Sequence, residues 1–123
     1  MAFGKKLKLL FNLKLAKSLS SINNQHTLNV GKFYNKNHDA FIKVYGEVIQ
    51  AFRTNNLDNI LNSQIDSIGL KNEHSVLDAG CGVCGPARYF AKKTGCTIDA
   101  VSISETQVEV SKQFIQNEEL QDK

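Results

Sequence analysis

The sequence predicts an α/β fold, a partial doubly wound parallel sheet preceded by two helices. Two short apolar runs, at residues 75–78 and 96–103, have the length and composition of strands. Apolar residues at helical spacing precede the first run, separate the two runs and follow the second. This order favours a parallel pair joined by a right-handed crossover. Two strands are too few for such a sheet, so we expect a truncated chain or a sheet completed in another way.

Length and composition are those of one globular domain. The chain has 123 residues, 41% of them hydrophobic and 22% charged. No apolar run approaches the roughly 20 residues that span a bilayer, so no transmembrane segment is predicted. Three cysteines, an odd number, do not suggest a secreted disulfide framework. We therefore expect a reducing compartment, the cytoplasm.

Charge divides the chain into two parts. Residues 1–38 contain seven lysines and no acid, whereas residues 39–123 contain eight basic and twelve acidic residues. The first part is predicted to be a basic, polar N-terminal extension, and the second the N-terminal part of a folded domain. The acidic balance of the second part argues against a nucleic-acid partner. Lysines interrupt every candidate signal sequence in the extension, and weak contact with a membrane surface stays an alternative to a solvated segment.

Two helices are predicted before the first strand. Residues 20–37 are polar and rich in asparagine, as expected of a linker. Asp39 is expected to cap a helix over residues 40–52, whose apolar residues recur at helical spacing. A second helix is predicted over residues 57–68, with Gly69 in the position that follows a helix C-terminus.

The remaining elements follow the first strand. Pro86 suits the first position of a helix that continues to Thr94 and ends at Gly95. After the second strand, Ser104 and Gln107 have the spacing of a capping box, in which the serine hydroxyl accepts from the Gln107 N–H. The Gln107 side chain is expected to reach back to the Ser104 backbone. The last helix is predicted at about residues 105–117.

A glycine-rich turn joins the first strand to its helix. Gly80, Gly82 and Gly85 fit the pattern G-x-G-x-x-G, which allows positive φ angles and close approach of a ligand. The N–H groups of the following helix suit a polar or anionic ligand. Asp78 precedes the turn, at a position that is usually apolar in nicotinamide-binding proteins. The alternative is that Asp78 only bonds the N–H groups of the turn.

The same turn contains a C-x-x-C pair, Cys81 and Cys84, at a helix N-terminus. This arrangement lowers thiol pKa values in redox proteins, so a thiol redox protein is an alternative function. The single proline, Pro86, cannot lie opposite the dithiol, which argues against a thioredoxin-like fold. No metal site is predicted, because two cysteines lack a second pair of ligands. The histidines are scattered and are predicted to be surface residues: His26, His38 and His74.

Two motifs resemble a known family. The segment LDAGCGVCG, residues 77–85, resembles the first motif of class I S-adenosylmethionine-dependent methyltransferases, a strand ending in D-x-G-x-G-x-G. Cys84 takes the place of the third glycine, and Ser102 stands where many members carry an acid. The segment VSISETQ, residues 101–107, resembles the branch that includes cyclopropane-fatty-acid synthases and sterol or small-molecule methyltransferases. The resemblance covers about residues 34–115 and implies a Rossmann-like domain.

The resemblance implies roles for particular residues in binding S-adenosylmethionine. Asp78 would organise the ammonium group of the methionine moiety, and the turn after it would line that moiety. Ser102 would meet a ribose hydroxyl, Ile103 would pack on adenine, and Gln107 would contact ribose or adenine. Tyr34 resembles an aromatic residue that precedes the cofactor site, with simple packing as the alternative. The predicted cofactor-binding residues are Tyr34, Asp78, Ala79, Gly80, Cys81, Gly82, Ser102, Ile103 and Gln107.

The predicted function is the S-adenosylmethionine-binding part of a methyltransferase that acts on a small-molecule or lipid acceptor. Alignment of the acceptor with the methyl group would supply much of the catalysis. No catalytic residue is assigned, because in the family pattern most of the residues that position the acceptor follow Lys123. Because the predicted sheet is incomplete, we expect this chain alone to have weak or no activity. The alternatives are a non-catalytic fragment or binding module and an NAD(P)-dependent oxidoreductase.

Overall fold

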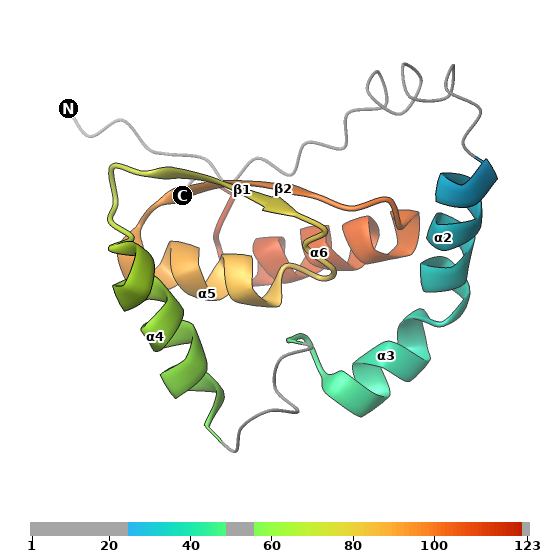
Figure 1. Cartoon of the computed structure of the whole chain (residues 1–123), viewed down its shortest axis with the longest axis horizontal. Helices are drawn as coiled ribbons and strands as arrows, with labels where there is room; N and C mark the ends of the chain where they lie inside the picture. Colours follow the sequence, from blue (N-terminus) through green and yellow to red (C-terminus); the bar gives the residue numbers. More distant parts are fainter. Residues whose placement is uncertain (1–24, 49–55, 122–123) are drawn as a thin grey trace.

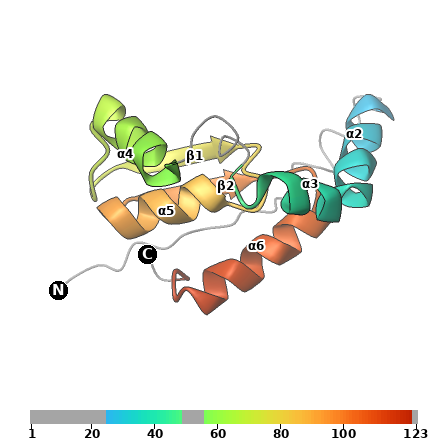
Figure 2. The same cartoon turned by 90° about the horizontal axis from the view of Figure 1, so that it is seen from below.

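A computed structural model describes residues 25–48 and 56–121. Figure 1 shows α5 and α6 on the same side of the two strands, with α4 near one end and α2 and α3 near the other. Seen from below, α4 lies beside α5, and α2 lies at the start of α6 (Figure 2). The elements are α2 (Gln25–Lys36), α3 (His38–Tyr45), α4 (Leu57–Ile68), β1 (Ser75–Ala79), α5 (Gly85–Thr94), β2 (Thr97–Val101) and α6 (Glu105–Asn117).

The described residues contain a two-stranded parallel sheet, β1 beside β2. Asp78 lies opposite Ala100 in the register, and Leu77 opposite Asp99. Ala100 is buried, whereas Leu77 is 66% exposed, because successive side chains of a strand point to opposite faces. The predicted α/β class and the parallel pairing are confirmed. Asp78 therefore lies on the same face of the sheet as the core.

The core lies between the sheet and its helices and is made largely of small side chains. Ala87 and Ala91 of α5 are almost fully buried, as are Ile98 and Ala100 of β2. Small side chains let the helix approach the strand closely, which keeps packing dense in a small domain. No helix in the described ranges is long and apolar enough to cross a membrane.

Three helices agree with the sequence prediction. α4 is capped by Asn56, whose side chain accepts from the Asn59 N–H at 3.0 Å, and it ends at Gly69 in the left-handed conformation (φ 59°). α5 ends at Gly95, also left-handed, and α6 begins after Ser104, whose hydroxyl accepts from the Gln107 N–H. β2 is shorter than predicted, because residues 102–104 form the turn that leads into α6.

The prediction of a linker at residues 20–37 was wrong for its described part, since α2 occupies Gln25–Lys36. Tertiary contacts stabilise this helix. A Cβ added to Gly31 would lie 3.0 Å from the Ile103 carbonyl oxygen, so α2 packs closely on the chain before α6. The Asn35 side-chain oxygen accepts from the Ser104 hydroxyl at 2.6 Å. A polar sequence thus forms a helix because a distant segment holds it.

The helix predicted at residues 40–52 is also corrected. α3 begins at His38 after the N-cap residue Asn37, so Asp39 lies in the first turn and is not the cap. The helix stops at Tyr45, because Gly46 has a φ of 65°. Residues 49–52 lie outside the described residues.

The histidine prediction holds for two of the three residues. His26 and His74 are exposed, and His74 Nδ1 accepts from the Lys71 N–H at 3.0 Å. His38 is buried, which contradicts the prediction of a surface residue. The packing of α3 explains the difference, since His38 lies on the helix face that turns inward.

Gly85 allows the chain after α3 to pack on the first turn of α5. A Cβ at this position would lie 2.2 Å from the Glu47 carbonyl oxygen and 2.7 Å from Val48 Cγ2. Because a backbone atom cannot move aside cheaply, we expect Gly85→Ala to lower the free energy of unfolding by about 2–3 kcal/mol. Urea denaturation measures this loss.

Gly31→Ala is the matched control for Gly85→Ala. Its Cβ would meet the Ile103 carbonyl oxygen at 3.0 Å, a milder contact that a small shift relieves. We expect a loss of about 1 kcal/mol or less, at the lower end of the cost of overpacking. Equal losses in the two variants would contradict the role given to Gly85.

Candidate functional site

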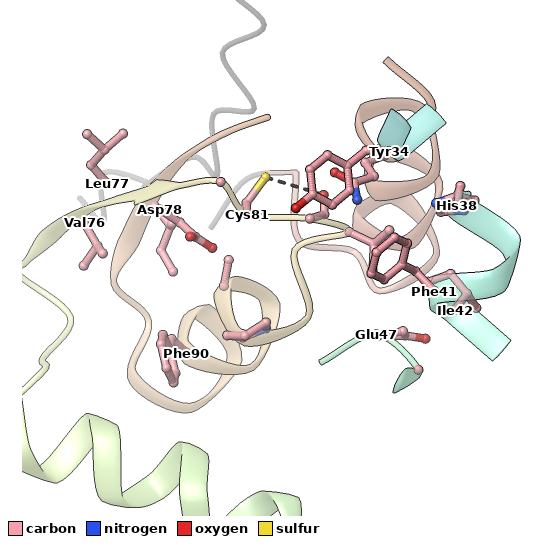
Figure 3. Close-up of a pocket in the computed structure, with 18 of the residues that line it drawn as sticks. Tyr34, His38, Phe41, Ile42, Glu47, Val76, Leu77, Asp78, Cys81 and Phe90 are labelled. Carbon is pink, nitrogen blue, oxygen red and sulfur yellow. Dashed lines mark hydrogen bonds between the residues drawn. The ribbon is translucent and has the colours of Figure 1, made fainter. Parts of the chain in front are cut away.

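A cavity of about 320 Å³ opens where β1 ends, within the size range of small-molecule sites. It lies between the glycine turn, the start of α5 and the α2–α3 segment (Figure 3). The lining includes residues far apart in the sequence. The predicted cofactor residues that line it are Tyr34, Asp78, Gly80, Cys81, Gly82 and Gln107.

Two of the three glycines in the turn have the positive φ angle that the sequence pattern predicts, whereas Gly85 is the first residue of α5. Gly80 and Gly82 have φ angles of 91° and 57°, and a Cβ at either residue would meet nothing within 4 Å. The backbone at these two positions is therefore open to a ligand. Cys84, at the place of the third glycine, is also left-handed (φ 61°, ψ 27°). A side chain at such a position costs about 1–2 kcal/mol.

Hydrogen bonds hold the turn against the end of β2. The N–H groups of Gly80 and Cys81 both donate to the Val101 carbonyl, at 2.9 and 3.1 Å. On the other side, the buried Ser111 hydroxyl of α6 lies 3.4 Å from the Gly82 carbonyl oxygen. The turn is thus positioned by both neighbouring elements before any ligand binds.

Asp78 points its carboxylate into the cavity (Figure 3). The side chain is half-buried, and within residues 25–48 and 56–121 it has no hydrogen bond or ion pair. Burial raises the pKa of this carboxyl above its ordinary value. The N–H groups of Gly80 and Cys81 bond to Val101, so the alternative role of Asp78 as their acceptor is not supported. The carboxylate is available to a cationic ligand.

The predicted capping box is only half confirmed. Ser104 Oγ accepts from the Gln107 N–H at 3.2 Å, as expected. The Gln107 side chain does not reach the Ser104 N–H, which donates to Ser102 Oγ at 3.1 Å. Ser102 Oγ in turn donates to Gln107 Oε1 at 2.9 Å. Ser102 therefore links the two and holds the Gln107 side chain beside the cavity.

Three predicted cofactor residues do not line the cavity. Ser102 touches it only through Gln107. Ala79 is exposed at the end of β1. Ile103 is 51% exposed, and its carbonyl packs against Gly31 of α2. Ala79 and Ile103 are therefore not among the residues that line the cavity.

An aromatic wall, which sequence reasoning found only in part, faces the glycine turn. The rings of Tyr34 and Phe41 lie 5.6 Å apart, and Phe41 and Phe90 line the cavity. The helical spacing of the apolar residues in the sequence places Phe41 on the apolar face of its helix, but it does not show that this face lines a cavity. Glu47 also lines the cavity, with its carboxylate paired to Arg88.

The cysteines of the C-x-x-C pair lie in the turn as free thiols. Cys81 lines the cavity, whereas Cys84 is fully buried behind it. Among the described residues, no group of three or more histidine, cysteine or acidic side chains could hold a metal ion.

Comparison with known proteins finds short segments of similarity and no matching protein-family model. The chain is 44% identical over 50 residues to methyltransferase GfsG of Streptomyces halstedii, a match covering 41% of the chain and 18% of that protein. It is 44% identical over 57 residues to sterol 24-C-methyltransferase ERG6B of Gibberella zeae, covering 46% of the chain and 15% of the relative. It is 37% identical over 54 residues to sterol 24-C-methyltransferase ERG6 of Saccharomyces cerevisiae, a match covering 44% of the chain and 14% of that protein. The matched segments thus span less than a fifth of each relative.

Proposed function

We propose, from the relationship of this chain to S-adenosylmethionine-dependent methyltransferases of the sterol methyltransferase branch, that it is the cofactor-binding part of such an enzyme. The observation that carries the proposal is the half-buried carboxylate of Asp78 at the end of β1, which has no partner among the described residues. It faces a cavity of suitable size, beside a turn whose glycines leave the backbone open. These features fit a ligand with a cationic end.

The fit to S-adenosylmethionine follows from its chemistry. The methionine moiety carries an ammonium group and a sulfonium, and a charge-assisted hydrogen bond from the ammonium to Asp78 would compensate the buried carboxylate. The open backbone at Gly80 and Gly82 would contact the same moiety. The linked Ser102 and Gln107 side chains offer polar atoms for ribose hydroxyls. When bound, the cofactor supplies an activated methyl group.

The acceptor is proposed to be a small molecule or a lipid. Two of the relatives are sterol methyltransferases by name, and the wall of the cavity opposite the turn contributes Tyr34, Phe41 and Ile42. Aromatic and aliphatic side chains favour an apolar ligand. Transfer would proceed by in-line displacement, with the residues of this chain holding the methyl donor in place.

Calorimetry of the chain with S-adenosylmethionine and with its demethylated product tests the proposal. We expect both to bind, because both carry the ammonium group that Asp78 would pair with. NADH serves as the control ligand, since the Asp78 position is usually apolar in nicotinamide sites. Absence of binding to both methionine derivatives, or binding of NADH in their place, would refute the proposed function.

A further inference from the structure

We propose that Cys81 and Cys84 form a reversible disulfide that distorts the glycine turn, so that the candidate site takes its cofactor only when the pair is reduced. Both residues are free thiols and both are buried. The disulfide itself follows from the geometry of the turn, whereas its effect on the cofactor rests on the proposed function.

A hydrogen-bonded turn brings the two cysteines close together. The Cys84 N–H donates to the Cys81 carbonyl at 2.8 Å, closing a four-residue turn. Such a turn keeps its end Cα atoms within about 7 Å, which overlaps the range of about 4.4–6.8 Å seen in disulfides. The Cys81 thiol donates to the Gly82 carbonyl at 3.6 Å, inside the same turn. The reduced pair can therefore become a disulfide through a rearrangement confined to this turn.

The surroundings favour a thiolate on Cys84. This residue is the N-cap of α5, where the helix dipole stabilises negative charge. The hydrogen bond from Cys81 lowers the pKa of Cys84, and Ser111 and Arg88 contribute further. The hydrogen bond to Cys84, together with burial, raises the pKa of Cys81. Of the two thiols, Cys84 is therefore the one whose pKa favours the thiolate form.

A small peroxide can reach the pair through the cavity, which Cys81 lines. After its proton passes to Cys84, the Cys81 sulfur attacks a peroxide oxygen and the O–O bond breaks. This step gives a sulfenic acid and, with a proton from solvent, one water or alcohol. Cys84 then releases that proton and attacks the Cys81 sulfur; the S–S bond forms, the S–O bond breaks, and the leaving hydroxide takes up the released proton to become water. The two thiols are oxidised by two electrons and the peroxide is reduced by two.

The disulfide would change the turn that faces the ligand. Cys81 lies between Gly80 and Gly82, and its Sγ is 3.6 Å from the Gly82 carbonyl oxygen. We expect bonding to Cys84 to draw this sulfur away from the Gly82 carbonyl and to change the backbone angles at Gly82, which lies between the two cysteines. Because glycine permits a wide range of φ angles, the backbone of the turn can change conformation at the place where the cofactor would bind.

Thiol counting tests the disulfide. The chain is treated with hydrogen peroxide, unfolded, alkylated and weighed by mass spectrometry, with dithiothreitol treatment in parallel. We expect the oxidised protein to retain one alkylatable thiol, Cys96, and the reduced protein three. Cys96→Ala is expected to retain none after oxidation, and Cys84→Gly, which suits the φ of 61°, two. Three free thiols after peroxide, or oxidation that dithiothreitol does not reverse, would overturn the proposal.

Calorimetry with the demethylated cofactor product tests the consequence. We expect the oxidised wild-type protein to bind at least about tenfold more weakly than the reduced protein, the change that follows from about 1.4 kcal/mol. The affinities of Cys84→Gly before and after peroxide should match each other. Equal affinities of oxidised and reduced wild type would overturn the switch. If the reduced protein does not bind at all, the proposed function fails, while the thiol count still decides whether the disulfide forms.

Discussion

Replacing Asp78 by asparagine is expected to weaken binding of S-adenosylmethionine about 10- to 100-fold, the worth of one hydrogen bond to a charged group. Asparagine keeps the size of the side chain but loses the charge that would pair with the ammonium group. The described structure offers no other unpaired carboxylate in the cavity, since Glu47 is bonded to Arg88. Calorimetry at neutral pH measures the change.

Asp99→Asn is the matched control. Asp99 lies opposite Leu77 in the register, so its side chain belongs to the face of the sheet away from the core, and Asp99 is not among the residues that line the cavity. We expect its affinity for the cofactor to equal that of the wild type. A comparable loss in both variants, or none in Asp78→Asn, would contradict the role of Asp78.

The pH dependence of binding follows from the same carboxyl. Only the ionised form pairs with the ammonium, so affinity should fall as pH is lowered through the pKa of Asp78. Because burial raises this pKa above its ordinary value of 3.8, the loss should begin at a higher pH than for an exposed aspartate. Calorimetry across a series of acidic buffers measures the onset.

The contribution of Asp78 to the free energy of unfolding should change with pH in the opposite direction to its contribution to binding. A carboxyl whose pKa is raised in the folded state favours folding below its unfolded pKa, and this contribution is lost as pH rises through the folded pKa. At neutral pH the buried charge of Asp78 therefore opposes folding, so we expect Asp78→Asn to be more stable than the wild type. The difference in the free energy of unfolding between the variant and the wild type should become smaller toward pH 3.8 and below. A variant that gains stability while losing affinity cannot be explained by damage to the fold.

Replacing Arg88 by methionine is expected to lower the free energy of unfolding by about 3 kcal/mol, the lower end of the range for breaking a buried ion pair. The Arg88 side chain is 5% exposed and pairs with Glu47, after α3, and Glu118, after α6. Its guanidinium also lies 4.5 Å from the centre of the Phe114 ring. The lower end of the range applies because Glu47 is 45% exposed and regains water when Arg88 is lost. Urea denaturation measures the change.

Lys92→Met is the control for Arg88→Met. Lys92 bonds the same Glu118 at 3.0 Å, but it is 48% exposed. Exposed ion pairs contribute about 0–1 kcal/mol, so we expect a change within that range. Equal losses in the two variants would show that the ion pairs of Arg88 do not stabilise the fold beyond a surface contact.

Local features of the sequence determined the bounds of several elements. Gly69 predicted the C-terminus of α4, and the Ser104 cap predicted the N-terminus of α6. Each of these residues acts within a few positions of the helix terminus. The turn between β1 and α5 followed from its glycines, since φ angles are set residue by residue. The assignment of Asp78 and the turn to a cofactor also came from the sequence and stays a prediction.

The tertiary structure alone decided the rest, because the determining contacts lie far apart in the sequence. α2 forms in a polar segment because Asn35 and Gly31 meet the chain before α6, and marginal helices depend on such packing. The fold brings Tyr34 and Asp78 to one cavity. It leaves Ile103 outside, and it shows that the carboxylate of Asp78 has no described partner. The spacing of residues in the sequence predicts local hydrogen bonds and the apolar face of each helix or strand. Only tertiary packing decides which faces contact one another and which polar groups are left for a ligand.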